Sequence, residues 1–223
     1  MHSYRAKVTR VDSNERMARC QVLVDGVGDD HTPMRCDNCF MPRIIAYLRA
    51  INVGGHIVKM DALRAHFEAL DLANVETFIA SGNVIFDMPA RANAAALESR
   101  IEKHLLGALG YEVATFLRSA ADNAAAAAFE AFPAAQVAAA HNTYVAFLKA
   151  SFTPAQSSAV LSFKSAVDDF VISGRELYWL CTVPSMDSKF SAARLEKALG
   201  APVTMRNTNT VRKLAAKYPG KFQ

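Results

Sequence analysis

The sequence lacks the features that mark several large classes of protein. No uninterrupted apolar run reaches about 18 residues, which argues against a membrane-spanning helix. Four cysteines in 223 residues are too few for a disulfide-dense fold, and ten glycines exclude a collagen-like chain. A hydrophobic fraction of 52% excludes a disordered chain, because a disordered chain cannot bury enough apolar surface to offset its entropy. The length suits one large domain or two small ones.

The common signatures of enzymes are also missing. There is no G-x-S-x-G, no G-x4-G-K-[ST], no G-x-G-x-x-G and no H-E-x-x-H, and the six histidines are scattered. Cys36 and Cys39 form a C-x-x-C, but Cys20 and His31 complete no recognised zinc spacing with them. We therefore name no catalytic residue, expect no metal and no cofactor, and leave open whether the chain is an enzyme.

The first 40 residues differ from the rest of the chain. They hold six basic and six acidic residues and show no helical periodicity. We expect them to be either an appended or misassigned extension ahead of a natural start at Met41, or a weak hairpin. No apolar signal segment follows Met1, and Cys181 is the only cysteine after residue 40, so we expect a cytoplasmic protein.

From residue 43 the apolar pattern switches between the periods of strands and helices. An apolar stretch at 44–51 is typical of a central strand. Met60, Leu63 and Phe67 recur at the spacing of an amphipathic helix. Two further strands, a helix that Gly110 ends and a last strand complete the order β-α-β-β-α-β. The expected strands and helix lie at 75–80, 84–86, 97–109 and 112–117. Residues 41–119 are thus expected to form one unit.

The same order of elements returns in the second half. Residues 120–142 are expected to form an alanine-rich helical connection, and residues 143–223 a second unit. Tyr47-Leu48-Arg49-Ala50 is echoed by 147–150, and the turn 81–83 by Ser173-Gly174-Arg175. These echoes predict an α+β fold, namely a tandem duplication of two ferredoxin-like (split β-α-β, βαββαβ) units with an extra C-terminal helix.

Four stretches carry a resemblance to a known family. They are 48–56 (LRAINVGGH), 75–86, 170–176 and 206–214 (RNTNTVRKL). In this order they resemble the bacterial family named domain of unknown function 1697, with departures at Ala50, where that family usually has glycine, and at Thr208. The resemblance covers about residues 41–218, and it implies a two-unit α+β fold and no particular reaction.

Two polar segments have the physics of anion sites. The loop 52–55 joins a strand to a helix, and its glycines let backbone N–H groups approach a ligand. In 206–213, an N-cap at Asn209 or Thr210 would place Arg212 and Lys213 in the first turn of a helix. Cations are unfavourable there unless an anion binds.

These observations favour a protein that binds a small anionic ligand bearing a phosphate or a carboxylate. The alternative is a ligand-free interaction module that forms a homodimer through an open sheet face or an edge strand. A further alternative is weak nucleic-acid binding by residues 189–223, with eight basic residues and one acidic residue. The net acidic charge of 41–188 argues against it, and no membrane partner is expected. The candidate ligand-binding residues are Arg49, Asn52, Gly54, Gly55, Lys59, Ser81, Asn83, Arg206, Asn207, Thr210 and Lys213.

Overall fold

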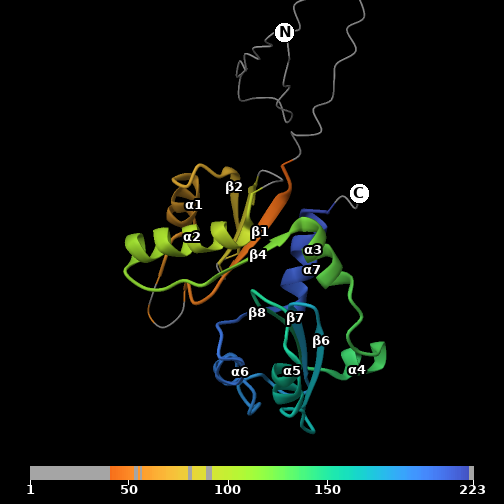
Figure 1. The fold of residues 1–223 in the computed structure, drawn as a ribbon. Coiled ribbons are helices and arrows are strands. Elements are labelled where there is room, and N and C mark those ends of the chain that lie inside the picture. The colour runs from red at the N-terminus through yellow and green to blue at the C-terminus, as the bar shows by residue number, and fades with distance from the viewer. Residues whose placement is uncertain (1–40, 53–54, 56, 80–81, 89–91, 221–223) are drawn as a thin grey trace, which may run out of the picture.

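The computed structural model describes residues 41–52, 55, 57–79, 82–88 and 92–220. Within them the chain forms two four-stranded antiparallel sheets, in the strand orders β2-β3-β1-β4 and β6-β7-β5-β8 (Figure 1). The elements are β1 (Arg43–Leu48), α1 (Met60–Glu68), β2 (Ala73–Phe78), β3 (Asn83–Asp87), α2 (Ala94–Leu109), β4 (Thr115–Ser119), α3 (Ala120–Ala128), α4 (Ala134–Ala139), β5 (Asn142–Phe147), α5 (Pro154–Leu161), β6 (Asp168–Ser173), β7 (Glu176–Cys181), α6 (Ala192–Leu199), β8 (Thr204–Asn207) and α7 (Thr208–Lys217).

Each sheet has an outer face covered by helices from its own half of the chain. Alternate residues of β1, such as Ala46 and Leu48, pack against α1 and α2, because successive side chains of a strand point to opposite faces. In the second sheet, Leu177 and Trp179 of β7 pack in the same way against α5 and α6. The α+β class expected from the apolar pattern is therefore present.

The two inner faces share one core. Tyr47 of β1 and Phe147 of β5 stack at its centre, with ring centroids 4.2 Å apart. Helices α3 and α7 pack against each other and join this core, as Figure 1 shows. Tyr178 points into it, whereas its neighbour Trp179 faces the outer core, and both side chains are buried. The described part of the chain thus leaves neither inner face open for a second copy or for stacked bases.

Helices α3 and α7 begin directly after the last strand of each sheet. Ser119 accepts a hydrogen bond from the N–H of Asp122 and completes a capping box at the start of α3. Asn207 caps α7 by accepting from Asn209 N at 2.9 Å. The expected cap at Asn209 or Thr210 is therefore wrong. The cations expected in the first turn lie in the second turn instead, where the unfavourable helix dipole has largely faded.

The two β-hairpins differ in their turns. Phe78 pairs with Asn83, whereas Ser173 pairs with Glu176 and leaves only two turn residues. The N–H of Leu48 donates to Gly82 O, and Leu148 N donates in the same way to the second residue of the short turn. Asn83 and Glu176 consequently occupy equivalent positions in the two sheets. The sequence echo instead aligns Asn83 with Arg175, which is one residue out of register.

The span 120–142, expected to be a helical connection, contains α3, α4 and the first residue of β5. The expected strand at 112–117 begins at Thr115 and continues to Ser119. Residues 1–40, with their C-x-x-C, lie outside the described residues, so the extension and hairpin interpretations stay expectations. Among the described residues, no helix is long and apolar enough to cross a membrane.

Candidate functional site

Arg206, one of the candidate ligand-binding residues, is buried between the two halves of the chain. Its Nε donates to Asn83 Oδ1 at 2.7 Å, and its Nη2 donates to the carbonyls of Leu48 at 2.8 Å and Gly82 at 3.1 Å. Its Nη1 donates to two oxygens of β8 itself. Burial lowers the pKa of Arg206 to about 10, so the side chain stays charged at neutral pH. Its Nε and Nη2 donors thus join β8 to the first sheet.

Arg118 makes the reciprocal contact in the opposite direction. Its Nε donates to Glu176 Oε1 at 2.7 Å and its Nη2 to Leu148 O at 2.7 Å. Glu176 and Leu148 hold the places in the second sheet that Asn83 and Leu48 hold in the first. Each half of the chain therefore inserts one arginine into the other half.

Two ion pairs form a second reciprocal set of contacts between the halves. Arg49, which follows β1, binds Glu196 of α6 through two hydrogen bonds of 2.5 and 2.7 Å. Lys149, which follows β5, binds Glu102 of α2 at 2.6 Å. Glu102 also accepts the N–H of Thr115, the first residue of β4. Glu196 likewise accepts the N–H of Val203, just before β8. Arg49 thus also takes part in joining the halves.

The glycine loop after β1 is closed by its own side chain. Asn52 Oδ1 accepts the N–H of Val58 at 2.7 Å, which brings the ends of the loop together. Gly55 is exposed with a φ of +91°, and Lys59 is an exposed, extended residue just before α1. Gly54 and Ser81 lie outside the described residues.

The last three expected residues lie at the start of α7. Asn207 caps the helix and also donates from Nδ2 to Asn142 Oδ1 at 2.9 Å. Thr210 is half-buried and Lys213 is exposed. The structure therefore brings Asn83 and Arg206 into direct contact within a packed junction.

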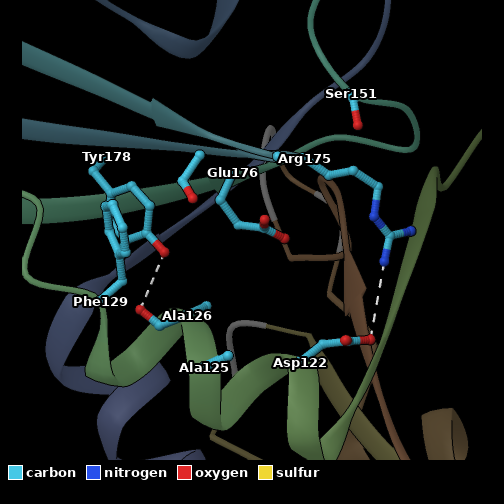
Figure 2. A pocket seen from close by; sticks show the side chains of 10 residues that line it. Asp122, Ala125, Ala126, Phe129, Ser151, Arg175, Glu176 and Tyr178 are labelled. Carbon is cyan, nitrogen blue, oxygen red and sulfur yellow. Dashed lines mark hydrogen bonds and ion pairs between the residues drawn. The ribbon is translucent and has the colours of Figure 1, made fainter.

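A pocket of about 370 Å³ does lie at the junction, between α3 and the β6–β7 turn. Figure 2 shows Arg175 reaching from the turn toward Asp122, with the Glu176 carboxylate between the turn and α3. Ser151 and Ser173 add hydroxyl groups to its lining. The pocket is thus built from both halves of the chain.

The charged groups of this pocket differ in how fully they are bonded. Glu176 is held through Oε1 by Arg118, whereas the closest partner of the Arg175 guanidinium is Asp122 Oδ2 at 3.9 Å. That distance is longer than a direct hydrogen bond. Within the described part of the chain the Arg175 side chain makes no hydrogen bond, and it is 37% exposed. Its donors can therefore reach a ligand or water.

The other end of the pocket is apolar. The ring of Phe129 packs against Tyr178 with centroids 4.8 Å apart, and Ala125 lies beside them. The Tyr178 hydroxyl donates to Ala126 O at 3.2 Å (Figure 2). Burial, and then the charge of Glu176, raise the pKa of Tyr178, so its hydroxyl stays a donor to that carbonyl. The pocket thus has a charged end and an aromatic end.

Sequence reasoning did not select the residues of this pocket. One signal was present, because the Ser173-Gly174-Arg175 turn echoes the Ser81-Gly82-Asn83 turn that was selected. The contribution of α3 carried no comparable signal. Asp122 lies in an alanine-rich helix, and only the packing of the two halves brings that helix to the turn.

Two other chemical groups lie elsewhere in the described structure. The Cys181 thiol is buried and donates to Val183 O at 3.0 Å, and burial raises its pKa, so it lacks the features of a nucleophile. His66 of α1 and His104 of α2 lie edge to face with centroids 5.5 Å apart. In the described residues, no three His, Cys, Asp or Glu side chains gather as metal ligands.

Comparisons with known proteins place the chain among relatives. The family described as "Protein of unknown function (DUF1697)" matches residues 41–178. The structure of the conserved bacterial protein SP0830 from Streptococcus pneumoniae is similar, with a TM-score of 0.62 and 24% identity over 81% of this chain and 100% of that chain. No curated protein matches the sequence. The family match spans more than half of the chain, so this protein belongs to the DUF1697 family.

Proposed function

We propose that this protein binds a small anionic ligand, bearing a carboxylate or a phosphate, in the pocket between α3 and the β6–β7 turn. The observation that carries the proposal is the contrast between Arg175 and the two buried arginines, Arg118 and Arg206. Arg118 and Arg206 are buried and hydrogen-bonded, whereas Arg175 lines a pocket and, among the described residues, its guanidinium meets only the Asp122 carboxylate, 3.9 Å away. A guanidinium recognises planar oxyanions through paired N–H donors.

We also infer that the two halves are copies of one ferredoxin-like unit. Both sheets have the same strand order, and each half ends in a helix that continues its last strand. The reciprocal arginines, Arg118 and Arg206, support the duplication because they stand at equivalent positions, opposite Ile45 and Val145. A duplicated chain creates a junction between its copies, and pockets often lie at such junctions.

The proposal is tested by thermal unfolding of the full chain. The probes are inorganic phosphate, glucose 6-phosphate, adenosine monophosphate and 3-phenylpropionate. A probe at about 100 times its Kd adds about 2.7 kcal/mol of stability, which raises the Tm of a chain of this size by roughly 5–10 °C. Arg175→Gln should remove that shift.

The matched control is Arg212→Gln, at an exposed arginine of α7. This variant should keep the full shift. A shift that survives in Arg175→Gln, or a panel that produces no shift at all, would overturn the proposal.

A further inference from the structure

We infer that the ligand of this pocket is a zwitterion with an apolar side group, such as an aromatic or aliphatic amino acid. This inference rests on the proposed function and narrows it, because it names a second charge that the ligand must carry. It follows from the balance of charges around Arg175 and from the position of the aromatic pair.

The charged end of the pocket carries the carboxylates of Asp122 and Glu176 and the guanidinium of Arg175. Asp122 Oδ2 accepts from Ser119 N at 3.1 Å and lies 3.9 Å from the Arg175 guanidinium. Glu176 Oε1 is bound by Arg118, and its Oε2 lies 3.7 Å from where a side chain at Gly174 would begin. One acidic oxygen therefore borders the small turn residue on the pocket wall.

A simple anion should bind this arrangement less tightly than a zwitterion does. To bind Arg175 it would have to compete with Asp122 for the guanidinium, and the two negative charges would repel each other at short range. A ligand with an ammonium group beside its carboxylate avoids this cost. Its carboxylate takes the place of Asp122 on the guanidinium, and its ammonium gives the displaced Asp122 carboxylate a new partner.

The apolar end of the pocket indicates that the ligand carries an apolar side group. Phe129 is 41% exposed although it packs against Tyr178, so part of its ring remains open to a ligand. The Tyr178 hydroxyl already donates its proton to Ala126 O, so it offers no donor to a ligand at this end. Figure 2 places the aromatic pair and the Arg175–Asp122 pair at opposite sides of the pocket. A volume of about 370 Å³ lies in the range of small-molecule sites.

The test compares three related compounds with the full chain by titration calorimetry. L-phenylalanine carries both charges, 3-phenylpropionate lacks the ammonium, and phenethylamine lacks the carboxylate. We expect L-phenylalanine to bind at least about tenfold more tightly than either, because each lost charge-assisted hydrogen bond costs about that factor. Asp122→Asn should abolish the preference for L-phenylalanine over 3-phenylpropionate, and Arg175→Gln should weaken both compounds. Asp61→Asn, at an exposed aspartate of α1, is the control and should change neither.

The outcomes separate this inference from the proposed function. If 3-phenylpropionate or a phosphate binds as tightly as L-phenylalanine, the zwitterion inference is overturned and the anion site stands. If phenethylamine binds as tightly as L-phenylalanine, the inference and the anion site both fall, because the carboxylate then contributes nothing. Both also fall if none of the compounds and none of the anions of the thermal panel binds.

Discussion

Two arginine side chains join the two halves of this molecule. Arg118 and Arg206 each cross the shared core and donate to main-chain carbonyls of the opposite sheet, and their guanidinium groups lie over Phe147 and Tyr47. Such carbonyls cost free energy when they are buried without a donor. The stability of the junction should therefore depend strongly on these two arginines.

Replacing Arg206 should destabilise the protein severely. Arg206→Gln leaves the carbonyls of Leu48 and Gly82 without their charged donor, and we expect the free energy of unfolding to fall by about 2–4 kcal/mol. Urea unfolding of the full chain measures this change. The control Arg212→Gln, at an exposed position, should shift it by at most about 0.5 kcal/mol. Equal stability of the two variants would contradict the role assigned to Arg206.

Contacts between elements also set how stability depends on pH. Helices α1 and α2 bring His66 and His104 into edge-to-face contact on the outer side of the first sheet. Burial, and then the nearby His104, lower the pKa of His66 below its ordinary value of 6.5. The unfolded chain therefore takes up the proton before the folded chain does, and stability should decline as the pH falls below about 6.5 and on through the folded pKa.

The helix pair gives a second prediction. His66→Gln should reduce the loss of unfolding free energy between about pH 7 and pH 5, because the group that titrates unfavourably is gone. Urea unfolding at several pH values measures the slope. His141→Gln changes an exposed histidine away from this helix pair and serves as the control. An unchanged slope in His66→Gln would show that His66 does not titrate differently in the folded state.

At the scale of the whole molecule, the shared core makes the two sheets depend on each other. Neither inner face has a covering layer of its own, because each is buried against the other and against α3 and α7. Separating the halves would expose the stacked rings of Tyr47 and Phe147 and would unpair the reciprocal arginines. We therefore expect the halves to unfold together.

We expect the full chain to unfold in urea in a single cooperative transition. Trp179 is the one tryptophan of the sequence and lies in the outer core of the second sheet, so its fluorescence reports on that half. Far-UV circular dichroism reports on both halves. The two signals should give the same urea midpoint, as a two-state transition requires. A midpoint by fluorescence that is clearly separate from the midpoint by circular dichroism would show that the halves unfold independently.

The sequence by itself determined the order and the kind of the elements. Alternating apolar residues and helical spacing are local signals, and they predicted the α+β class and most of the strands and helices. Four short motifs of the sequence also resemble the DUF1697 family, which the comparison confirms. The sequence did not identify Asn207 as the cap of α7, because several nearby polar side chains are able to cap the same helix.

Only the tertiary structure decided what the polar residues do. Arg206 and Arg175 are both arginines near a strand end in the sequence, and no local pattern tells one from the other. One is buried against carbonyls of the opposite sheet, and the other lines a pocket beside α3. The difference arises from how the inner faces of the two sheets pack, and that packing depends on contacts between residues far apart in the chain.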